Sequence, residues 1–159
     1  MLLNILLVIV LALCVIGGWK RGAILTLGRV VAAILAFLIA KNWSPLLGNL
    51  IGIVMPNRSG LTQLIAFIVI LFVVERLISL LASLANVVLK IITSLPIISF
   101  LNKIIGAILG LAEGVIFFGS AIYMVMAGRL DPTLMSWISG SFIAGWIHFG
   151  FRYLMAYFL

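Results

Sequence analysis

Long uninterrupted apolar segments are the feature that most constrains how this chain can fold. They run from Leu2 to Ile16, Ala23 to Ala40, Leu61 to Val74 and Ile104 to Ala127. A helix needs about 20 residues to cross a hydrocarbon layer roughly 30 Å thick, so each segment, with its flanks, can cross once. The chain is also 66% hydrophobic and only 8% charged, unlike water-soluble domains. The sequence therefore predicts an all-α integral membrane protein with four transmembrane helices.

Glycine and proline residues divide the chain into its expected parts. Residues 1–127 are predicted to form the transmembrane domain, with spans at about 2–18, 23–40, 61–80 and 104–127. A tight turn is expected at Gly22, and a long apolar loop at the outer interface is expected from Asn42 to Gly60. Pro96 is expected to end the third helix and to leave a short link from Ile97 to Lys103.

The C-terminal segment, residues 128–159, is rich in aromatic side chains and is interrupted by Gly140, Gly145 and Gly150. Aromatic residues collect at the headgroup level of membranes, and glycines make a rigid span less favourable. We expect one or two interfacial helices here. The alternative is a fifth span starting near Leu134, because the remaining residues are numerous enough to cross the bilayer.

The net charge of +7 comes from ten basic and three acidic residues. In a soluble chain this excess would suggest nucleic acid as a partner, but here the basic residues are scattered between spans and serve as topology and headgroup anchors. The expected partners are therefore the lipid bilayer and its anionic headgroups, and no nucleic acid. Lys20 and Arg21 after the first span, together with an uncharged N-terminus, favour both termini outside the cytoplasm.

A polar stripe follows the third helix. On a helical wheel from Glu75 to Ser94, all polar side chains fall in one arc of roughly 100°. The stripe beyond the charged pair consists of Ser79, Ser83, Asn86, Lys90, Thr93 and Ser94. This pattern predicts a long third helix whose amphipathic extension reaches residue 95. The stripe either lines a wet lumen or lies flat on the headgroups.

Two rows of small residues repeat at four-residue spacing. One row, on the second span, consists of Gly28, Ala32, Ala36 and Ala40, and the other, on the fourth span, consists of Gly106, Gly110 and Gly114. Small residues at this spacing allow helix backbones to approach closely in lipid. We expect the second and fourth spans to pack within one chain, and a homo-oligomer seam is the alternative.

Four charged residues lie within the predicted spans. On their wheels, Arg29 falls on the small-residue face of the second span and Glu113 falls beside Gly106 on the fourth. Together with Glu75 and Arg76, they reach similar depth. Because an isolated charge in a membrane is costly, we expect a neutral intramembrane charge cluster of these four residues. Alternatively, Arg76 and Arg29 extend to the headgroups without a partner.

Catalytic groups are scarce. The chain has three acidic residues, one histidine (His148) and one cysteine (Cys14), and these are dispersed along the sequence. Acid–base, nucleophilic and metal chemistry all need such groups to converge. We therefore expect no enzyme activity, no catalytic residues, no metal site and no cofactor.

Two short motifs stand in order along the chain. The first is Gly18-Trp19-Lys20-Arg21-Gly22 after the first span, and the second is Asn102-Lys103-x-x-Gly106-x-x-x-Gly110 at the start of the fourth. With this arrangement of spans, the chain resembles the colicin V production protein family from about Met1 to Val125. The resemblance implies a small multi-pass protein of the bacterial inner membrane, linked to colicin V production and envelope robustness.

Two functional hypotheses remain. The first is a non-enzymatic scaffold or accessory factor for toxin export or envelope maintenance, with protein partners that the sequence does not identify. The second is an oligomeric channel or transporter whose lumen is lined by the polar stripe of the third helix.

Overall fold

The computed structural model describes residues 2–53, 59–89, 96–128 and 132–156, and its regular structure there is helical throughout. The helices are α1 (Leu2–Arg21), α2 (Ala23–Gly52), α3 (Ser59–Leu89), α4 (Pro96–Gly128), α5 (Pro132–Ser139) and α6 (Phe142–Leu154). Within the described ranges, four helices are long and apolar enough to cross a membrane. This confirms the prediction of an all-α protein with four candidate spans.

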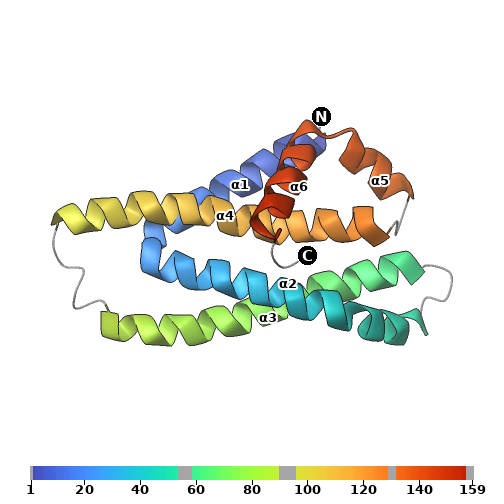
Figure 1. The fold of residues 1–159 in the computed structure, drawn as a ribbon, viewed down its shortest axis with the longest axis horizontal. Helices are drawn as coiled ribbons and strands as arrows, with labels where there is room; N and C mark the ends of the chain where they lie inside the picture. Colours follow the sequence, from blue (N-terminus) through green and yellow to red (C-terminus); the bar gives the residue numbers. More distant parts are fainter. Residues whose placement is uncertain (1, 54–58, 90–95, 129–131, 157–159) are drawn as a thin grey trace.

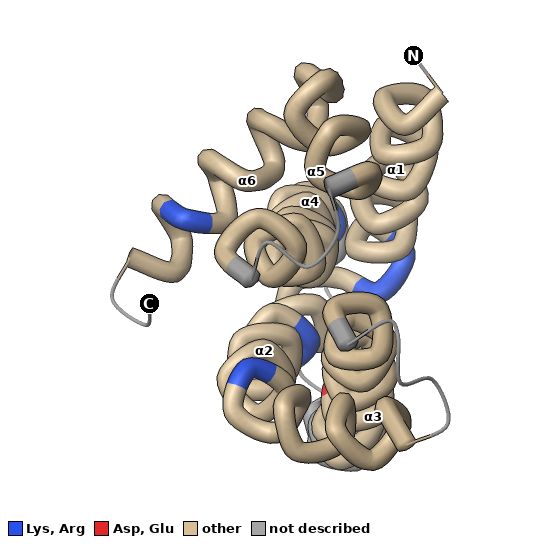
Figure 2. The backbone as a smooth tube through the Cα atoms, turned by 90° about the vertical axis from the view of Figure 1, so that its right-hand side faces the viewer, with Lys and Arg blue, Asp and Glu red and all other residues tan. Residues whose placement is uncertain are grey.

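The long helices form two layers. α2 and α3 lie side by side in one layer, and α1 and α4 pair in the other, with α6 across α4 (Figures 1 and 2). Between the layers lies a core that includes Phe37 of α2, Phe67 and Leu71 of α3, Ile116 of α4 and Phe151 of α6. The Phe37 ring makes edge contacts with Phe67 and Phe151, at centroid distances of 6.3 and 5.1 Å. α4 is therefore the element that joins the two layers.

The prediction of a loop from Asn42 to Gly60 is wrong for its first part, because α2 continues without a break to Gly52 with Pro45 inside it. A proline inside a helix removes one backbone hydrogen bond and so favours an end. Here the second half of α2 packs closely on α3: Ser44 is fully buried, and a Cβ atom at Gly48 would lie 2.9 Å from the Gln63 Cα atom. This packing offsets the missing bond.

The prediction of a short link from Ile97 to Lys103 is also wrong, because α4 begins at Pro96 and these residues form its first turns. Proline is favourable at the first position of a helix, where its missing N–H has no intrahelical acceptor to lose. The same residue type that predicts a helix end therefore begins the next helix.

The C-terminal segment forms two short helices separated by Gly140 and Ser141, and neither is long enough to cross a bilayer. Asn4 Oδ1 accepts hydrogen bonds from the Ser141 hydroxyl and from the backbone N–H of Ile143, the latter at 3.3 Å. The inner face of α6 buries Ala144, Ile147 and Phe151. One face of this helix thus belongs to the bundle core, whereas a location at the headgroups stays a prediction.

Candidate functional site

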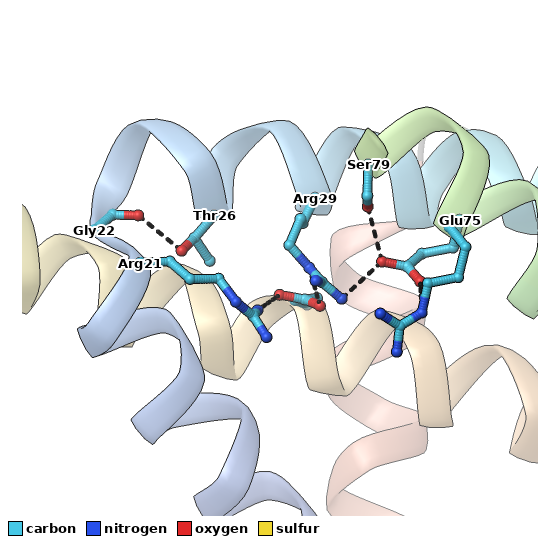
Figure 3. Close-up of polar contacts among 8 residues, drawn as sticks. Arg21, Gly22, Thr26, Arg29, Glu75 and Ser79 are labelled. Atoms are coloured by element: carbon cyan, nitrogen blue, oxygen red, sulfur yellow. Dashed lines mark hydrogen bonds and ion pairs between the residues drawn. The ribbon is translucent and has the colours of Figure 1, made fainter. Parts of the chain in front are cut away.

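The centre of the candidate site is Arg29, one side chain that contacts two other helices. Its Nε donates to Glu113 Oε1 of α4 at 2.8 Å, and its Nη2 donates to Glu75 Oε1 of α3, also at 2.8 Å. Figure 3 shows Arg29 between the labelled Arg21 and Glu75. The side chain of Arg29 is only 16% exposed, that of Glu113 is 11% exposed and that of Glu75 is 4% exposed. A guanidinium suits this bridge, because it presents several N–H donors in one rigid plane.

Two further arginines lie at the edge of this network. Arg21 Nη1 of α1 is 3.6 Å from Glu113 Oε2, and Arg76 Nε of α3 is 3.7 Å from Glu75 Oε2. Both separations are longer than hydrogen bonds. The Arg76 guanidinium also stacks 4.9 Å above the ring centre of Phe72, a cation–π contact. Ion pairing here is therefore tight at Arg29 and loose at Arg21 and Arg76.

The structure brings Arg29, Glu75, Arg76 and Glu113 together and adds Arg21 to them. The four predicted residues are two arginines and two glutamates, and Arg21 adds a third arginine, so the formal charge of the enlarged cluster is +1. We call these five residues the charge network. Arg21 is seven residues after Cys14 and three after Gly18, so the helical spacing places all three on one face of α1. This shared face could have predicted from the sequence that Arg21 belongs to the charge network.

Ser79 is the one member of the predicted polar stripe whose side chain is described. Its hydroxyl donates to Glu75 Oε1 at 3.0 Å, so that oxygen accepts from both Ser79 and Arg29. The other stripe residues lie outside the described side chains: Ser83, Asn86, Lys90, Thr93 and Ser94. The amphipathic extension of α3 therefore stays a prediction.

The glycine row of α4 packs against α1 and the turn after it. The second and fourth spans do contact each other within the chain, as expected, but through other residues than these glycines. A Cβ atom at Gly18 would clash with the carbonyl oxygen of Gly106, and a Cβ atom at Gly110 would clash with that of Cys14. At Gly114 the nearest atoms belong to Leu11 and Cys14. Sequence reasoning missed Gly18, although Cys14, Gly18 and Gly22 repeat at the same four-residue spacing.

The small-residue row of α2 faces the core instead. Ala32, Ala36 and Ala40 have no exposed surface, and the last two belong to the cluster that contains Phe67 of α3. Gly28 is partly buried. This row therefore lets α2 pack closely into the core that α3, α4 and α6 complete.

The family motif residues meet at the turn between α1 and α2. Gly22 has φ +84°, a conformation that favours glycine, and a Cβ atom there would clash with the Asn102 side chain. The Oδ1 atom of Asn102 accepts from the Ala23 N–H at 2.8 Å, so a side chain of α4 satisfies the first turn of α2. Thr26 adds a hydroxyl bond to the Gly22 carbonyl at 2.8 Å. Lys103 is exposed beside them.

A cavity of about 240 Å³ lies beside the charge network. α1, α3 and α4 supply most of its wall, and α2 contributes Arg29. Its polar side is made by the charge network, and its apolar side includes Val10, Leu13, Phe72, Phe117 and Phe118. The cavity is therefore amphipathic.

Other titratable groups stand apart from this site. His148 lies near Tyr123, with ring centres 6.3 Å apart; partial burial and then the nearby Arg152 cation lower the pKa of its imidazole. Over the described ranges, no three His, Cys, Asp or Glu side chains are grouped so as to hold a metal ion.

Comparison with known proteins places the chain. No curated protein and no solved structure matches it. The profile of one family, described as colicin V production protein, matches residues 3–150. The match includes the Gly22 turn, the Asn102 contact, the glycine crossing and every residue of the charge network. The chain therefore belongs to the colicin V production protein family, as its two motifs predict.

Proposed function

We propose that this protein is a non-enzymatic scaffold in the bacterial inner membrane that supports toxin export or envelope maintenance. The observation that carries the proposal is how the charged groups of the spans are used. Arg29 pairs with both Glu75 and Glu113 at 2.8 Å, so these groups join α2, α3 and α4 to one another. Arg29, Glu75 and Glu113 are mostly buried and engaged with one another, so these three groups hold the helices together and are not presented to a permeating ion.

The cost of breaking the buried ion pairs supports a fixed arrangement of the transmembrane helices, which we call the frame. Removing one partner of a buried ion pair leaves the other charge uncompensated, which costs about 3–5 kcal/mol. Arg29 serves two carboxylates, so its loss exposes both to that penalty. Together with the glycine crossing of α1 on α4, this network defines the relative positions of all four long helices.

A scaffold also needs a surface for other components. Along α1 only Leu7 and Gly18 are buried, and Leu6, Ile9 and Leu13 are more than half exposed. This apolar face contacts lipid or the spans of partner proteins. Of the four candidate spans in the described ranges, α1 has the smallest buried share.

The second candidate is an oligomeric channel lined by the polar stripe of α3. It is favoured by Ser79, which begins the stripe one turn beyond Glu75, and by the cavity that Glu75 and Arg76 line. In this alternative, further copies of the chain complete the lumen around the stripe.

Two variants separate these functions in cells whose colicin V production depends on this protein. Arg29→Gln dismantles the frame, so we expect colicin V output to fall at least tenfold. Ser83→Leu places a bulky apolar side chain on the predicted stripe, which blocks a narrow lumen but leaves a scaffold intact. Unchanged output with Ser83→Leu supports the scaffold, and a block by it supports the channel. Arg152→Gln, an exposed arginine of α6, is the control for loss of one charge.

A further inference from the structure

Among the described residues, two cations of the charge network, Arg21 and Arg76, have no hydrogen-bonding partner. The carboxylate contacts of Arg21 and Arg76 are 3.6 and 3.7 Å long, and the side chains are 35% and 56% exposed. Arg29 and one other arginine are enough to balance Glu75 and Glu113. One guanidinium charge therefore remains available for an anion that comes from outside the network.

The lining of the cavity beside these arginines suits an amphipathic ligand. Arg21 is the last residue of α1, and Val10, which also lines the cavity, is eleven residues earlier, roughly 16 Å along the helix. The wall therefore runs from a charged helix end to the apolar middle of a span. Leu13, Phe117 and Phe118 continue the apolar side. A molecule with an anionic group at the arginines and a hydrocarbon chain along this wall matches both the charged and the apolar section of the cavity.

We propose that this cavity binds an anionic phospholipid, with the phosphate at Arg21 and Arg76 and the start of one acyl chain along Val10, Leu13 and Phe118. A phosphodiester carries a single negative charge, which neutralises the surplus of the network. Arginine is also the side chain best suited to phosphate, because its N–H donors pair with two oxygens at once. The bilayer supplies such a ligand directly, and the lipid joins α1 to α3. This proposal does not depend on the scaffold function.

Arg76 is the residue to change in a test, because its side chain is more than half exposed and makes no hydrogen bond to a described residue, so we expect Arg76→Gln to fold. Arg152→Gln is the matched control: it removes an exposed arginine of α6 that lies outside this cavity. Thermal unfolding in a neutral detergent is then followed after adding phosphatidylglycerol, phosphatidylcholine or inorganic phosphate.

We expect phosphatidylglycerol at saturation to raise the Tm of the parent by roughly 5 °C, and phosphatidylcholine or phosphate to raise it by less than half as much. Arg76→Gln should lose most of the phosphatidylglycerol effect, and Arg152→Gln should keep it. Native mass spectrometry of the parent should retain one phosphatidylglycerol. Equal stabilisation by the two lipids overturns the proposal, as does an unchanged effect in Arg76→Gln. Stabilisation by phosphate alone assigns the site to a free anion instead.

Discussion

Arg29 is the side chain on which the transmembrane frame most depends. Two of its nitrogen atoms reach carboxylates on two different helices, both at 2.8 Å. A lysine ammonium is a single point charge and cannot reproduce this planar geometry. The Arg29 position thus requires arginine for its shape as well as for its charge.

Arg29→Gln should lower the free energy of unfolding by about 3–5 kcal/mol, because it leaves Glu75 and Glu113 without their main partner. Glu113→Gln should also destabilise. In the double variant the losses should be less than additive, with a coupling energy of about 1–3 kcal/mol. Denaturation in detergent with all four proteins measures this coupling.

The control cycle combines Glu113→Gln with Arg152→Gln. Arg152 is an exposed residue of α6 outside the charge network and its cavity, so the coupling should be under about 0.5 kcal/mol. Strictly additive losses for Glu113 and Arg29 would contradict the pairing that the structure describes.

Helical wheels could place Arg29, Glu75 and Glu113 on inward faces, because position on a face depends only on spacing along one helix. They could not identify the pairs. Pairing depends on which helices are neighbours, and Arg21 entered the network only because α1 crosses α4. A residue at a helix end also looks like a headgroup anchor from the sequence, and Arg21, the last residue of α1, fits that description.

At the scale of helices, the crossing of α1 on α4 is the closest contact. Gly18→Ala should destabilise the protein by about 1–3 kcal/mol, because the added methyl group meets the carbonyl of Gly106 and the backbones must separate. Thermal unfolding in detergent measures the effect.

Gly145→Ala is the control for the crossing. It adds the same methyl group within helix α6, at a position with open space around it. It should be neutral, or stabilising by up to about 1 kcal/mol through helix propensity. A Gly18→Ala protein as stable as Gly145→Ala would show that the crossing is looser than described.

The docking of α6 gives another prediction about helix packing. Phe151 is fully buried among Phe37, Tyr123 and Gly119, whereas Phe149 on the same helix is 67% exposed. Phe151→Ala should cost about 3–5 kcal/mol, because a large side chain leaves the core. Phe149→Ala should change stability by less than about 1 kcal/mol. Equal effects in thermal unfolding would mean that α6 does not pack on α4 as described.

The long apolar segments were enough to predict which parts of the chain are spans, since composition and length decide that property. Helix pairing was not predictable in the same way. A row of glycines fits any neighbour that also has small residues, and both α1 and α2 offer such a row. The loop expected from Asn42 and the link expected after Pro96 are helical instead, because packing and position within the helix override a proline's local preference.

For the whole molecule, the hydrogen bonds from Ser141 and Ile143 to Asn4 place the start of α1 and the start of α6 on the same side of the bundle. The positive residues after the first span predict that this side is outside the cytoplasm. In a Cys14→Ser background, a cysteine at position 139 should react with an impermeant thiol reagent added to intact cells or spheroplasts. A cysteine at position 20 should not. Labelling at position 20 and not at position 139 would show the opposite orientation of the protein in the membrane.

The central claim is that the charged groups of the spans hold a scaffold together rather than line a pore. Single-channel recording of the purified protein in planar bilayers tests it most directly. The account predicts no conductance above background for the parent protein and for Arg29→Gln. Conductance that is blocked by Ser83→Leu and shifted toward cations by Lys90→Glu would contradict the scaffold and establish the channel.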